Sequence, residues 1–68
     1  MASDIPFRKI RRLLESHGWS LDRINCSHHV FTGPRRPTVT IPVHRGKARH
    51  EYLRHAEKKI KEWRETGG

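Results

Sequence analysis

The 68-residue sequence has few acidic residues, a single cysteine and no long apolar run. Cys26 cannot form an internal disulfide, and the chain has no Cys/His spacing typical of structural zinc. No apolar stretch approaches the roughly 20 residues that a membrane-spanning helix needs, and the N-terminus lacks the basic and apolar regions of a signal peptide. We therefore expect a soluble, cytoplasmic protein, with no metal and no other cofactor.

Positive charge is what the sequence has in excess. Lys and Arg number 15 against 7 Asp and Glu, which gives a net charge of +8. A polyanion such as nucleic acid is the natural partner for this charge. A chain this short buries roughly 60% of its unfolded surface and has little room for a deep, closed cavity. We expect one domain over residues 1–68, with residues 65–68 as a frayed tail.

An amphipathic helix is predicted near the N-terminus. It begins at residues 3–4, either of which can cap it, and Pro6 is tolerated in its first turn. Gly18 supplies the left-handed position that ends the helix, and Trp19 packs back over the last turn. His17 is interpreted as a capping residue that suits the helix dipole. One stripe of the helix is apolar: Phe7, Ile10, Leu13 and Leu14.

The pattern then changes to a period of two, which is typical of strands. The expected strands are residues 21–24, 28–32 and 38–41. Residues 25–27 read as a tight connection, and residues 33–37, with two prolines, read as a longer turn. Pro42 stops the third strand or marks it as an edge, because proline removes a ladder donor.

A second amphipathic helix is predicted from about Lys47 to Arg64. Its apolar stripe consists of Ala48, Tyr52, Leu53, Ala56, Ile60 and Trp63. The order α-β-β-β-α predicts a two-layer α+β domain, in which a three-stranded antiparallel sheet carries both helices on one face. Double-stranded-RNA-binding domains (dsRBDs) have this shape.

Histidines gather in and beside the predicted strands. Ser27-His28-His29 opens the second strand, and His44 follows the third. Imidazole, with an unperturbed pKa of about 6.5, can donate or accept a proton near neutral pH. RNA carries its own nucleophile, the 2′-hydroxyl, so a metal-free ribonuclease needs proton transfer, charge stabilisation and alignment. His28 and His29 point to opposite faces of a regular strand, so we expect at most one of them to be catalytic.

Several roles stay open for the neighbouring residues. Ser27 could orient His28 or simply close the turn. His29 could pack against a helix or touch phosphate, and His44 fits a supporting, an RNA-contacting or a structural role. The basic residues expected in the loops at the two ends of the third strand could clamp phosphates: Arg35, Arg36, Arg45, Lys47 and Arg49.

These segments resemble the HicA family of toxins, which are small ribonucleases of toxin–antitoxin pairs. The resemblance covers roughly residues 5–45. It rests on the helix ending in Gly18-Trp19, on Ser27-His28-His29-Val30-Phe31, and on Pro42-Val43-His44, which are similar to the family's Gly-Ser-His-His and Pro-x-His segments. It implies a dsRBD-like fold, metal-independent mRNA cleavage with one essential histidine, here His28, and a cognate HicB-like antitoxin.

The sequence departs from the family pattern in two places. Cys26 stands where the family usually has Gly, and it would be strained if the turn needs a positive φ. The last helix is also longer and more basic than the family's usual one. The prediction is therefore an mRNA-cleaving toxin; the alternative is a non-catalytic RNA-binding module with dsRBD-like shape readout.

Overall fold

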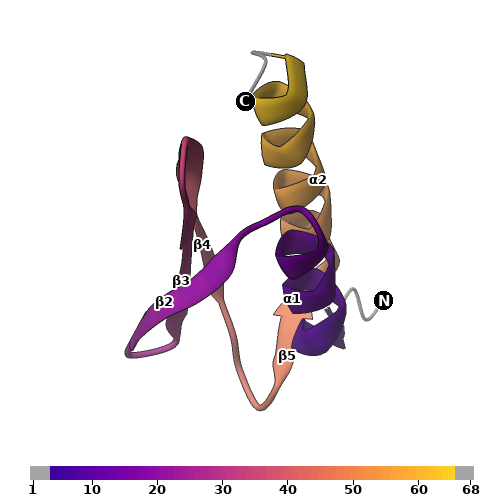
Figure 1. Cartoon of the computed structure of the whole chain (residues 1–68). Coiled ribbons are helices and arrows are strands. Elements are labelled where there is room, and N and C mark those ends of the chain that lie inside the picture. Colours follow the sequence, from indigo (N-terminus) through magenta and orange to yellow (C-terminus); the bar gives the residue numbers. More distant parts are fainter. Residues whose placement is uncertain (1–3, 66–68) are drawn as a thin grey trace.

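The computed structural model describes residues 4–65, which form two helices, a three-stranded sheet and a two-stranded sheet (Figure 1). The helices are α1 (Phe7–Ser16) and α2 (His50–Glu65). The larger sheet is antiparallel, in the order β2 (Ser20–Asn25), β3 (His28–Gly33) and β4 (Arg36–Pro42). The smaller one pairs β1 (Asp4–Pro6) with β5 (Lys47–Arg49). The predicted α+β fold is confirmed.

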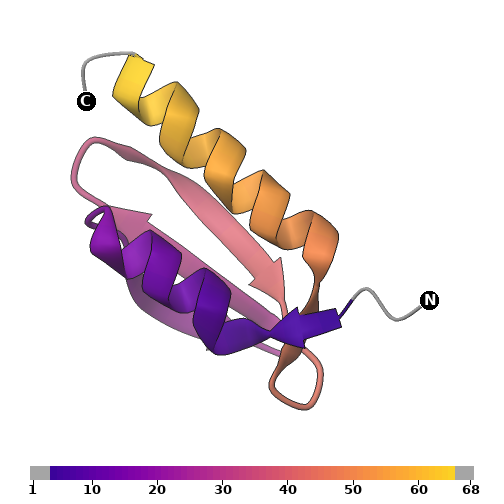
Figure 2. The ribbon, with the colours of Figure 1, turned by 90° about the vertical axis from the view of Figure 1, so that its right-hand side faces the viewer.

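Both helices cover the same face of the larger sheet, and the opposite face carries no helix (Figures 1 and 2). Apolar side chains from both layers meet between them and are fully buried. The sheet contributes Phe31, Val39 and Ile41, while α1 contributes Ile10 and Leu14. Burying a side chain of this size stabilises the fold by about 1.5–3 kcal/mol. The core therefore fixes which face of each strand turns toward the helices.

The end of α1 follows the prediction closely. Gly18 has a φ of 94°, the left-handed conformation that glycine adopts without strain. The Gly18 N–H donates to the Glu15 carbonyl at 3.1 Å, and the Trp19 N–H donates to the Leu14 carbonyl at 3.0 Å. This pair of bonds is the Schellman arrangement. His17 Nδ1 lies 3.0 Å from the Leu13 carbonyl, so the predicted capping role of His17 is confirmed.

The beginnings of both helices were predicted wrongly. Residues 4–6 form a strand instead of the first helical turn, and α1 begins at Phe7, whose N–H donates to the Gly46 carbonyl at 2.9 Å. The second helix was expected to begin at Lys47, but residues 47–49 form β5 and α2 begins at His50. The cause is the pairing of β1 with β5, in which Ala48 is buried as part of the core. Ala48 was wrongly assigned to the helix because its spacing from Tyr52 also fits the apolar stripe of a helix.

The turn predicted at residues 33–37 is also shorter than expected. Gly33 pairs with Arg36, which leaves a two-residue loop of Pro34 and Arg35. The proline ring fixes φ near −65°, and Arg35 follows with a φ of 61°, which fits a type II turn. Arg36 is therefore the first residue of β4 and not a loop residue. At the C-terminus, α2 extends to Glu65, and the rest of the predicted tail lies outside the described residues, as does Ser3.

Candidate active site on the open face of the sheet

His28 is exposed on the face of the sheet that carries no helix. It is the first residue of β3, and its cross-strand partners are Asn25 on β2 and Pro42 on β4. Side chains alternate along a strand, and Phe31, three residues on, is fully buried against the helices. His28 must therefore point the other way, so its imidazole is accessible to a large ligand.

His29 points toward the helices. Its ring centroid lies 4.6 Å from that of Phe7 on α1, in a tilted arrangement. His29 Nδ1 lies 3.4 Å from the Ser27 carbonyl oxygen, and the side chain is half-buried. The two histidines face opposite ways, as predicted, and His29 packs against a helix.

The turn that precedes His28 is built on an unusual backbone conformation. Cys26 is exposed and has a φ of 58°, in the left-handed region that costs a non-glycine residue about 1–2 kcal/mol. The Ser27 carbonyl accepts a hydrogen bond from the Val43 N–H at 2.7 Å. Ser27 thus closes the turn through its backbone and ties the end of β4 to the start of β3. The strain expected at Cys26 is present.

His44 lies at the same end of the sheet as His28. Its N–H and carbonyl exchange hydrogen bonds with Lys47 at 2.8 and 2.9 Å across a tight turn. Arg45 and Gly46 form that turn with φ values of 53° and 75°, as a type I′ turn requires. Val43 packs against the core, so the alternation of side chains puts the exposed His44 on the same side of the chain as Pro42.

The five basic residues predicted to bind RNA fall into two groups. Arg45, Lys47 and Arg49 lie in the turn after β4 and on β5, at the His28 end of the sheet, and all three are exposed. Arg35 and Arg36 lie at the opposite end of β3, about 17 Å from His28 for a six-residue strand. The first group is therefore much nearer to His28 than the second.

The comparisons with known proteins decide the family. The family model described as "HicA toxin of bacterial toxin-antitoxin" matches residues 7–62. The chain belongs to the HicA toxin family. Its membership implies a partner antitoxin, and the match runs through most of α2, well beyond the segments that carried the resemblance in the sequence. No curated protein and no solved structure gives a significant match.

Arg36 has a structural position in this HicA-family toxin that its sequence did not reveal. Its Nε donates to the His17 carbonyl and its Nη1 to the Pro34 carbonyl, both at 2.8 Å. The guanidinium carbon lies 4.1 Å from the ring centroid of Trp63 and 5.4 Å from that of Trp19. Arg36 therefore joins the turn after α1, the β3–β4 turn and the end of α2.

Glycine at position 18 makes room for this arginine. A Cβ there would collide with the Arg36 guanidinium, and the positive φ of Gly18 disfavours other residues independently. Trp19 is held in the same cluster, because its Nε1 donates to the Pro37 carbonyl at 2.9 Å. The sequence signal for this arrangement is that Gly18, Trp19 and Trp63 all lie near helix ends. Only the folded chain brings them into one cluster.

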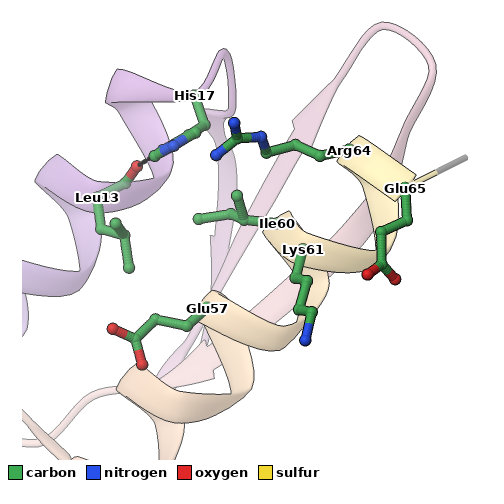
Figure 3. Close-up of a pocket in the computed structure, with 7 residues that line it drawn as sticks. All are labelled: Leu13, His17, Glu57, Ile60, Lys61, Arg64 and Glu65. Atoms are coloured by element: carbon green, nitrogen blue, oxygen red, sulfur yellow. Dashed lines mark hydrogen bonds between the residues drawn. The ribbon is translucent and has the colours of Figure 1, made fainter. Parts of the chain in front are cut away.

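A groove of about 480 Å³ lies on the helix side of the molecule, between the end of α1 and the last turns of α2 (Figure 3). Its lining mixes both charges over an apolar base: Leu13, His17, Glu57, Ile60, Lys61, Arg64 and Glu65. The Arg64 side chain extends toward the end of α1, the His17 imidazole points to the Leu13 carbonyl, and Glu57 lies at the other end (Figure 3). The groove lies across the core from His28, so it does not belong to the candidate active site.

Within residues 4–65, no three His, Cys, Asp or Glu side chains come together in a way that could hold a metal ion. Neither helix of the described chain is long and apolar enough to cross a membrane.

Proposed function

We propose that this HicA-family toxin is a metal-independent endoribonuclease that cleaves mRNA, with His28 as its general acid or base. The single observation that supports this most is the contrast between the two adjacent histidines. His29 is packed on Phe7, whereas His28 is exposed on an open face that a polyanion can reach. An imidazole that only stabilised the strand would not need that exposure.

The proposed reaction uses the RNA, the side chains of the chain and solvent water. The 2′-hydroxyl oxygen attacks the phosphorus, the bond to the 5′-oxygen breaks, and the products are a 2′,3′-cyclic phosphate and a 5′-hydroxyl end. His28 accepts the 2′-hydroxyl proton or donates a proton to the leaving 5′-oxygen, and solvent water makes the other proton transfer. The histidine contributes about 10²- to 10⁴-fold. Arg45, Lys47 and Arg49 would bind the flanking phosphates.

Control of such a small nuclease is proposed to come from outside the domain. A HicB-like antitoxin of acidic character would meet a net charge of +8 and associate rapidly by electrostatic steering. By covering His28 and the basic residues around it, this partner would exclude RNA from the same surface. The complex would form in the cytoplasm.

The test compares His28→Ala with a matched control, His50→Ala, which removes another exposed imidazole from the first residue of α2. Purified proteins are incubated with an mRNA transcript in chelator, and cleavage rates are measured. We expect His28→Ala to lose at least 100-fold and His50→Ala to stay near wild type. Cleavage by His28→Ala at the wild-type rate would exclude the assignment, and RNA binding by wild type without cleavage would favour the RNA-binding module.

A further inference from the structure

A second groove lies beside the end of β4, the strand that pairs with β3 at His28. It has a volume of about 420 Å³ and is lined by residues of β1, β4, β5, α2 and the turn after β4: Asp4, Pro42, His44, Lys47, Ala48, Arg49 and Tyr52. We call it the β5 groove. Figure 2 shows the end of β4, the turn after it and the start of α2 at one end of the molecule.

The β5 groove adjoins the candidate active site through Pro42. Pro42 lines the groove and is also the cross-strand partner of His28 on β4. Directly paired residues on neighbouring strands have Cβ atoms about 4.5–5.5 Å apart. An RNA strand whose scissile phosphodiester lies at His28 would therefore bring an adjacent nucleotide to the mouth of the groove.

The lining of the β5 groove suits one nucleotide. Its volume lies within the range of about 300–1,000 Å³ that small-molecule sites occupy. Lys47 and Arg49 are exposed cations that can bind phosphate. Two carboxylates offset part of this positive charge: Asp4 in the groove, and Glu51, whose Oε1 lies 3.8 Å from an Arg49 guanidinium nitrogen. Tyr52 is half-buried and supplies the aromatic ring on which an unpaired base could stack.

We infer that the β5 groove binds an unpaired nucleotide of the RNA next to the phosphodiester held at His28. Tyr52 contributes the stacking surface, and Lys47 and Arg49 contact the phosphates. The inference rests on the proposed function, because it takes RNA bound at His28 as the occupant. A base within a duplex is stacked and paired and cannot enter such a groove, so the substrate at this site is single-stranded.

The test measures RNA binding separately from cleavage. In a His28→Ala background, the affinity for a short, labelled single-stranded RNA and for a duplex of the same sequence is measured by fluorescence anisotropy. Tyr52→Leu keeps an apolar side chain against the core but removes the ring, and Tyr52→Phe keeps the ring. We expect Tyr52→Leu to weaken single-strand binding about 5- to 150-fold, to leave duplex binding unchanged, and to be rescued by Tyr52→Phe.

A second pair of variants keeps the test valid if Tyr52→Leu unfolds. Lys47→Ala should reduce the slope of log affinity against log salt for the single strand by about 0.7, whereas Lys61→Ala, on the far part of α2, should not. Unchanged single-strand binding by a folded Tyr52→Leu, or equal effects of Lys47→Ala and Lys61→Ala, would overturn the inference. Loss of binding in Tyr52→Leu with no cleavage by wild type would remove the ribonuclease proposal alone.

Discussion

Replacing Arg36 by alanine should destabilise the fold by about 2–4 kcal/mol. The half-buried bond from Nε to the His17 carbonyl involves a charged donor and is worth about 1.5–3 kcal/mol. The exposed bond to Pro34 adds about 0.5 kcal/mol, and the contact with the Trp63 ring about 0.5–2 kcal/mol. These contributions overlap, because all of them hold the same side chain, so the total is less than their sum.

The loss would be a large part of the stability of this domain. At about 0.05–0.15 kcal/mol per residue, the chain has about 3–10 kcal/mol in total. Each kcal/mol shifts the Tm of a domain of this size by about 4–8 °C, so Arg36→Ala should melt roughly 10–25 °C below wild type. Urea unfolding followed by far-ultraviolet circular dichroism is the suitable assay, because it does not depend on the tryptophans that Arg36 contacts.

Two further variants show whether geometry or charge is responsible. Arg36→Lys keeps the charge but loses the planar fork that reaches two carbonyls, so it should retain less than half of the stabilisation. Arg35→Ala removes the neighbouring arginine, which is exposed in the turn, and should change stability by less than about 0.5 kcal/mol. An Arg36→Ala variant as stable as wild type, or an equal loss of stability in Arg35→Ala, would contradict the structural role of Arg36.

The turn before His28, the two histidines and the salt dependence of RNA binding can each be tested in the same way. Cys26→Gly should relieve backbone strain and stabilise the protein by about 0.5–1 kcal/mol in thermal melts, whereas the β-branched Cys26→Val should destabilise it. His29→Ala should cost about 1–2 kcal/mol in urea unfolding through the lost contact with Phe7, while His28→Ala should stay within about 0.5 kcal/mol of wild type; the reverse order would contradict the assignment of faces. Affinity for single-stranded RNA should fall steeply with salt concentration in a titration series. Arg45→Ala should reduce the slope of log affinity against log salt by about 0.7, and an affinity indifferent to salt would exclude a polyanion as the ligand.

Local signals in the sequence were sufficient for much of the fold. The end of α1 depends on Gly18 and Trp19, which follow each other directly, and the opposite faces of His28 and His29 follow from the alternation within one strand. The positive φ at Cys26 was also predictable, because the family pattern has glycine there.

What could not be predicted depends on contacts between distant segments. The pairing of Ile5 with Ala48 turns two short pieces of expected helix into strands, and neither piece carries a strand pattern of its own. The position of Arg36 requires His17 and Trp63 to meet at one corner of the fold. From its charge, Arg36 was predicted to contact RNA. Nothing in the sequence near Arg36 indicates that it reaches the His17 carbonyl and the Trp63 ring.

Metal-independent RNA cleavage through attack by the 2′-hydroxyl leaves a defined chemistry at the fragment ends. Wild-type protein is incubated with a structured mRNA transcript in excess chelator, and both ends of the fragments are identified by mass spectrometry. We expect cleavage that leaves a 2′,3′-cyclic phosphate or its opened form on one side and a 5′-hydroxyl on the other. Fragments that carry 5′-phosphate ends, or cleavage that occurs only when a divalent metal is restored, would contradict it.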